Sequence, residues 1–219
     1  MSDIFTEVDD DVRRDKAEAF WRKYQNHVFA AALAIVLAAA GYRYYDYTRG
    51  LAAEAAGVEF AKAIELDRAG KGAEAQAALA KLASDAPTGY RVIARLAGAA
   101  TLANSDAPGA IQAYDVLAND AGLGPLFQDA AKLRGALLRM DAGESDKAKP
   151  TLEALAAPDG AFRHSAREAL GALALKAGDI AAAGKWLDMA VSDPDAPEGV
   201  KKNAEALLGL VASAKPAAK

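Results

Sequence analysis

The sequence contains no cysteine among its 219 residues and only two histidines, His27 and His164. Without cysteine, neither a disulfide framework nor a thiolate metal site can form. The motifs G-x-S-x-G, H-E-x-x-H and G-x-x-x-x-G-K-[ST], which serve nucleophilic, zinc and phosphate chemistry, are also missing. A lone histidine at a helix start most often has a surface or packing role, which we expect for His164. We therefore expect no enzyme activity, no metal and no cofactor.

Strand patterns and an excess of positive charge are lacking as well. No run alternates apolar and polar residues with β-branched enrichment, whereas alanine, the strongest helix former, is abundant. The predicted fold class is therefore all-α. Residues 52–219 carry 19 Lys and Arg against 22 Asp and Glu. This balance argues against nucleic acid as a partner.

Two short stretches resemble ligand-binding loops only superficially. The segment Asp193–Glu198 contains three acidic residues, but its two prolines and the missing calcium-loop pattern predict a linker that ends a helix. The segment Gly122-Leu123-Gly124 has no strand before it, so we expect a loop between repeats rather than a nucleotide-binding turn.

The strongest positive feature is residues 24–42, which contain no Asp, Glu, Lys or Arg. A helix rises about 1.5 Å per residue, so roughly 20 apolar residues cross a hydrocarbon core about 30 Å thick. Aromatic residues, which favour membrane interfaces, flank the segment: Trp21, Tyr24, Tyr42, Tyr44, Tyr45 and Tyr47. We predict a transmembrane anchor with its aromatic flank at 24–47.

Two alternatives compete with this anchor. Ala38-Ala39-Ala40 fits the cleavage site of a signal peptide, although the long acidic segment before it does not. A helix buried in a soluble core is the other alternative, although residues 13–23 are too polar to share that core.

The distribution of Lys and Arg predicts the orientation of the anchor. Residues 8–27 hold five of them, and the equally long window 43–62 holds three. Positive residues favour the cytoplasmic side. We therefore predict a cytoplasmic head at 1–23, with the part after the anchor translocated.

Four positions after the anchor recur at spacings of 35, 38 and 35 residues: Gly70, Ser105, Gly143 and Gly178. Alanine follows each by five residues: Ala75, Ala110, Ala148 and Ala183. A larger apolar residue follows by nine: Leu79, Tyr114, Leu152 and Leu187. A small residue precedes by seven: Ala63, Gly98, Ala136 and Gly171. Such columns predict closely packed helix pairs with a turn between them.

We expect the pairs at 53–69 with 73–84, 90–103 with 108–119, 126–142 with 145–156, and 162–177 with 180–192. Together they form a solenoid over residues 48–197, about four helix pairs. A further helix at 198–214 has an apolar stripe that would cover the exposed end of the stack. Residues 198–219 are therefore predicted as a capping helix and tail.

Units of this length and pattern resemble the tetratricopeptide repeat. The charged head, the anchor, the exit Gly41-Tyr42-Arg43-Tyr44-Tyr45 and the repeats are together similar to the bacterial ancillary Sec-translocon subunit family. That resemblance implies a single-pass inner-membrane protein with a periplasmic repeat domain. Its implied partners are translocon components, periplasmic chaperones or emerging secretory chains.

These expectations define a membrane-tethered interaction scaffold or chaperone-like module that assists secretion. The alternative is a structural assembly factor of an envelope or cell-division complex, which would act through its anchor. For the scaffold, basic residues on the first helices are candidates for binding acidic segments or C-terminal carboxylates. They are Arg91, Arg95, Lys132, Arg134, Arg139 and Arg167.

Overall fold

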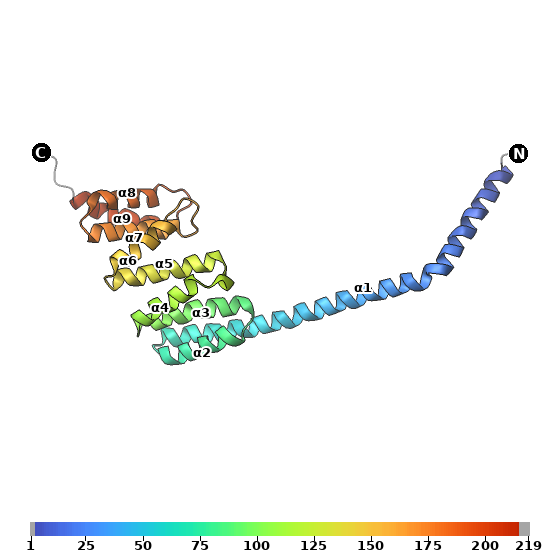
Figure 1. The fold of residues 1–219 in the computed structure, drawn as a ribbon, viewed down its shortest axis with the longest axis horizontal. Coiled ribbons are helices and arrows are strands. Elements are labelled where there is room, and N and C mark those ends of the chain that lie inside the picture. Colours follow the sequence, from blue (N-terminus) through green and yellow to red (C-terminus); the bar gives the residue numbers. More distant parts are fainter. Residues whose placement is uncertain (1–2, 215–219) are drawn as a thin grey trace. The chain divides into compact units, whose positions relative to one another are not determined.

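A computed structural model describes residues 3–214, and every regular element in that range is helical (Figure 1). Residues 3–12, 15 and 17 are described by their backbone alone. Residues 1–2 of the head and the tail predicted at 215–219 lie outside the described residues. The chain divides into two compact units at Glu54 and Ala55.

The first unit consists of most of helix α1 (Asp3–Arg68). We expected the first repeat helix to begin at residue 53, but α1 continues without a break from the predicted anchor into the repeats. The first proline of the chain is Pro87, so nothing before it blocks a helix. Gly41 and Gly50 each lower helix stability by only about 1 kcal/mol relative to alanine, and the many alanines nearby favour the helix.

The second unit starts with the last turns of α1, and its described residues continue through eight further α-helices. Their bounds agree with the predicted ones to within two residues. They are α2 (Gly72–Asp85), α3 (Thr88–Ala103), α4 (Ala107–Ala118), α5 (Pro125–Asp141), α6 (Ser145–Leu155), α7 (Arg163–Lys176), α8 (Ile180–Val191) and α9 (Glu198–Ala214). The predicted all-α repeat architecture is confirmed.

The repeating columns of the sequence form the core. All four residues of the alanine column are fully buried, and so are Leu79, Leu152 and Leu187 of the larger apolar column. Three of the four turn residues, Gly70, Gly143 and Gly178, adopt positive φ angles between 75° and 79°. Only glycine adopts this conformation without strain, which explains its place at the end of three of the four first helices. At the second turn, the side chain of Asp106 instead caps α4 by accepting from Gly109 N.

Core contacts join each repeat to the next. The first cluster contains Ala63, Leu79 and Ala94, which come from α1, α2 and α3. The two middle clusters follow the same arrangement one repeat further along. In the last cluster, Ala204 and Val211 of α9 pack against Leu187 of α8, where a further repeat would otherwise continue the stack. Helix α9 therefore covers apolar surface that the final pair would leave exposed.

The connection between the second and third repeats contains a short 3-10 helix, η1 (Ala121–Leu123). We had predicted only a loop there. Leu123 is buried there, and Gly124 has a φ of 77°. Asp120 accepts hydrogen bonds from Gly122 N and from the Arg95 guanidinium. This connection accommodates the longer spacing between Ser105 and Gly143.

Candidate interaction surfaces

The six basic residues predicted to bind partners do not gather on one surface. Arg91 is exposed and donates to Thr88 Oγ1 one turn earlier on α3. Lys132 is paired with Asp129 on its own helix, with the two charged atoms 2.8 Å apart. Arg134 is exposed on α5. The remaining three lie between helices, which the sequence alone did not indicate.

Arg95 and Arg139 bridge neighbouring elements. Arg95 lies 2.6 Å from the carboxylate of Asp120, and Arg139 reaches Asp115 on α4 at 2.5 Å. The hydrogen bond from Arg95, helped by the Gly122 amide, holds the pKa of Asp120 below its usual value. Both arginines therefore already form ion pairs within the repeat domain.

Arg167 is only 5% exposed and belongs to a charged cluster between α7 and the segment that follows α8. It donates to the carbonyl oxygens of Ala156 and Met189 and to the carboxylate of Asp193. Arg163 donates to the same carboxylate at 2.9 Å. The hydrogen bond from Arg163, helped by the backbone amide of Asp195, holds the pKa of Asp193 well below the usual carboxyl range. The predicted linker after α8 is therefore fixed to α7 by charge.

His164 completes this cluster. Its imidazole is buried, as a packing role required, and Nε2 lies 3.0 Å from Asp193 Oδ2 without the alignment of a hydrogen bond. Among the described residues no group of three or more His, Asp or Glu side chains is placed to hold a metal ion. Ion pairs of Arg163 and Arg167 with Asp193 join elements that are distant in sequence.

A small hollow lies on one side of α5, between α3 and α5. It has a volume of about 260 Å³, and Arg134 and Asp141 lie beside small apolar residues of α3, Ala100 and Ala103. The side chain of Tyr114 reaches it from α4. Burial raises the pKa of the Tyr114 hydroxyl, while the charge of Arg134 acts in the opposite direction.

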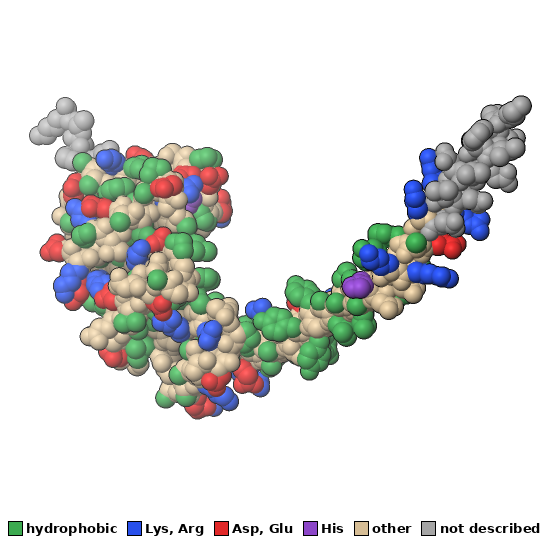
Figure 2. All heavy atoms as spheres, turned by 45° about the vertical axis from the view of Figure 1, so that its right-hand side comes forward, with side chains coloured by type: hydrophobic (Ala, Val, Ile, Leu, Met, Phe, Trp, Pro, Cys, Tyr) green, Lys and Arg blue, Asp and Glu red, His purple; other side chains and the backbone are tan. Residues whose placement is uncertain are grey.

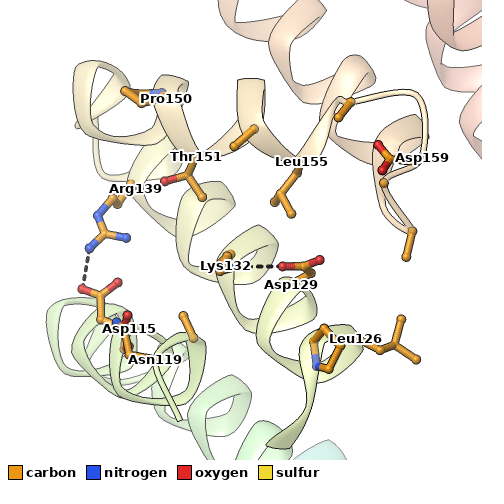
Figure 3. Close-up of a pocket in the computed structure, with 16 residues that line it drawn as sticks. Asp115, Asn119, Leu126, Asp129, Lys132, Arg139, Pro150, Thr151, Leu155 and Asp159 are labelled. Atoms are coloured by element: carbon orange, nitrogen blue, oxygen red, sulfur yellow. Dashed lines mark hydrogen bonds and ion pairs between the residues drawn. The ribbon is translucent and has the colours of Figure 1, made fainter. Parts of the chain in front are cut away.

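A larger groove of about 830 Å³ lies on the opposite side of α5 (Figure 3). At 100° per residue, Asp129, Lys132 and Arg139 share one face of α5, whereas Arg134 and Asp141 point the other way. Helices α4 and α6 form the walls of the groove, and the turn after α6 closes one end with Asp159 and Gly160. Apart from its charged residues, the groove is lined mainly by leucine, proline and alanine.

The segment of α1 that we predicted as an anchor is exposed on every side. Its large apolar residues are between 45% and 70% exposed: Val28, Phe29, Leu33, Ile35, Val36 and Leu37. Figure 2 shows hydrophobic side chains projecting from this single helix. The helix contains an 18-residue window of mean hydropathy 1.5 with no buried residue, long and apolar enough for a membrane span or a signal sequence.

Comparison with known proteins places the chain in a family. The tetratricopeptide repeat-like domain family matches residues 18–207, which include the exposed apolar segment as well as all four helix pairs. No curated protein and no solved structure matched the chain. Repeat domains of this kind act in general as protein-interaction scaffolds. With its buried columns, its paired helices and this match, the chain belongs to the tetratricopeptide repeat-like family.

Proposed function

We propose that this protein is a membrane-tethered interaction scaffold that assists the Sec translocon and emerging secretory proteins in the bacterial periplasm. Residues 24–42 cross the inner membrane once, residues 1–23 lie in the cytoplasm, and the repeats lie in the periplasm. The observation that supports the tether is the exposure of six large apolar residues on a stretch of α1 that no described residue covers. Such a surface is unfavourable in water and favourable in a bilayer.

The tyrosines after this segment support the same assignment. Tyr42 and Tyr45 lie on one side of α1, and Tyr44 and Tyr47 lie on the other, since residues three apart share a helix face. All four are exposed. Aromatic rings on both sides of a helix suit the interface of a bilayer, which surrounds the helix, better than a protein contact on one side.

Topology is the first test of the proposal. A C-terminal alkaline phosphatase fusion is expected to be active, and a C-terminal fluorescent protein that folds only in the cytosol is expected to be dark. Recovery of uncleaved protein in carbonate-washed membranes distinguishes an anchor from a signal peptide. An inactive phosphatase fusion, or a shortened protein released from the membrane, would overturn the tether.

Contact with the secretion machinery is the second test. The photo-reactive amino acid p-benzoylphenylalanine, placed at Ala100 in the hollow between α3 and α5, is expected to crosslink translocon subunits or secretory chains. The same probe at the exposed Glu205 on α9 serves as the control. Crosslinks to division or envelope proteins, formed only from positions 24–42, would instead identify the structural assembly factor.

A further inference from the structure

The groove between α4 and α6 has a charge pattern that selects its occupant. Its lining contains three carboxylates and two cations. Two of the carboxylates are already paired, Asp115 with Arg139 and Asp129 with Lys132 (Figure 3). Asp159 is exposed and makes no ion pair with a described residue. The groove therefore carries one uncompensated negative charge, located at the end formed by the turn after α6.

The space beside Asp159 is apolar. Leu126 is 54% exposed at this end and presents apolar surface to the groove. Leu155 of α6, which is itself buried, lies across the groove from it (Figure 3). Pro125 and Ala161 also line the groove. Burial of an exposed leucine side chain stabilises a complex, because apolar surface leaves water.

Resting on the proposed function as an interaction scaffold, we infer that this groove binds a short segment of a partner protein that carries apolar side chains next to a lysine or arginine. The apolar side chains cover the exposed Leu126, and the cation pairs with Asp159. Asn119 and Thr151 on the two walls offer hydrogen bonds to the backbone of an extended segment. A volume of about 830 Å³ lies within the range of ligand-sized sites.

An acidic segment fits this groove less well. Its carboxylates would have to compete with Asp115 and Asp129 for cations that are already paired at 2.5 and 2.8 Å. It would also approach the free charge of Asp159, and like charges in contact disfavour a complex. The groove thus differs in preference from the basic surface predicted for the first helices.

Peptide binding to the full chain in nanodiscs of zwitterionic lipid tests the inference. The probe is a fluorescein-labelled peptide, Gly-Ser-Lys-Leu-Ala-Leu-Lys-Ser-Gly, which presents a cation at either end of its apolar centre. Matched peptides replace both lysines with glutamate or both leucines with serine, and empty nanodiscs measure lipid binding. We expect saturable anisotropy changes for the first peptide alone.

Variants of the groove then identify the contacts. Leu126→Ser is expected to weaken the lysine peptide about tenfold, and Asp159→Lys about threefold to fivefold. Asp159→Lys should also allow the glutamate peptide to bind, a gain that loss of folding cannot produce. Val116→Ser and Asp188→Lys change exposed residues outside the groove and are expected to leave the affinity within about twofold.

Several outcomes would overturn the inference. They are the absence of saturable binding, equal binding of all three peptides, and tighter binding of the glutamate peptide. If deletion of residues 215–219 raised peptide affinity more than about tenfold, the chain's own tail would be the occupant. If the peptide separated a dimer in analytical ultracentrifugation, a second copy of the chain would be the occupant of the groove. None of these results affects the crosslinks from Ala100 or the fusion topology, so the proposed function is tested separately.

Discussion

Individual small residues in this protein set how closely its helices approach. Gly171 on α7 is the sharpest case, since a β-carbon placed there would lie 2.5 Å from both Cγ and Cδ2 of Leu187. Leu187 is itself fully buried and held on all sides by the last core cluster. The contact therefore has no room to adjust, and the smallest residue is required.

Replacement of Gly171 by alanine is expected to lower the free energy of unfolding by roughly 1–3 kcal/mol through overpacking. Gly209→Ala on α9 is the matched control, because nothing lies within 4 Å of its added β-carbon. There the higher helix propensity of alanine should raise stability by up to about 1 kcal/mol. Urea unfolding of the full chain in detergent measures both changes, and stabilisation by Gly171→Ala would contradict the packing argument.

The charged cluster between α7 and the segment after α8 gives a prediction that depends on pH. Asp193→Asn is expected to cost roughly 1.5–3 kcal/mol of unfolding free energy at pH 7, since it weakens charged hydrogen bonds from Arg163 and Arg167. The pKa of Asp193 is lowered in the folded state, so its stabilising contribution is complete above the ordinary carboxyl pKa of about 3.9. Below that value the unfolded chain takes up the proton first, and the contribution falls as the pH falls.

Urea unfolding at pH 7 and pH 3 checks this dependence. The difference between wild type and Asp193→Asn should shrink by about 1 kcal/mol at pH 3. Asp188→Asn, an exposed change on α8, is the control and should have little effect at either pH. An Asp193→Asn effect that is equal at both pH values would show that the carboxylate is not stabilised by its cationic neighbours.

At the level of elements, local sequence patterns predicted the helices but not the shape of the connections between them. The alanine column and the glycine turns are local patterns, because a helix pair brings together residues that are less than one repeat apart in the sequence, such as Ala63 and Leu79. The shape of residues 120–124 depends instead on Arg95, which is 25 residues earlier in the sequence than Asp120. No periodicity within the loop reveals that partner.

The contacts of the candidate site could not be predicted from local sequence either. Sequence position placed Arg167 on a first helix, yet its partner Asp193 is 26 residues away, beyond a whole further helix. The segment around Asp193 was expected to end a helix, which it does, but its role in holding α7 required the fold. The groove between α4 and α6 also depends on three elements, so no single motif could predict it.

Packing within a helix pair provides the prediction at this scale. Ala148→Leu inserts extra carbons where α6 meets the third core cluster and is expected to lower unfolding free energy by roughly 1–3 kcal/mol. Ala177→Leu changes an exposed residue at the end of α7 and should alter it by less than about 0.5 kcal/mol. Thermal unfolding of the full chain compares the two, and equal losses would show that the alanine column does not set the helix spacing.

At the level of the whole molecule, the apolar segment of α1 is long enough to span a bilayer but not strongly hydrophobic. Its six large apolar residues contribute about −0.3 to −0.6 kcal/mol each to membrane insertion, a total of about −2 to −4 kcal/mol. Alanine contributes little. A single charge at the centre of the segment costs about 2.5–3.5 kcal/mol, which is comparable to the entire favourable sum.

Leu33→Lys is therefore expected to release most of the protein from the membrane. Leu33 lies at the middle of residues 24–42 and is exposed on α1, so no packing contact is lost with it. Val58→Lys, at another exposed apolar position of the same helix but beyond the tyrosines, is the matched control and should leave the protein membrane-bound. Carbonate extraction followed by immunoblotting measures the membrane fraction of each variant. If Leu33→Lys stayed in the membrane pellet while still sedimenting as a monomer in detergent, the bilayer would not be what covers this helix. The proposed tether would then fail although the repeats remained intact.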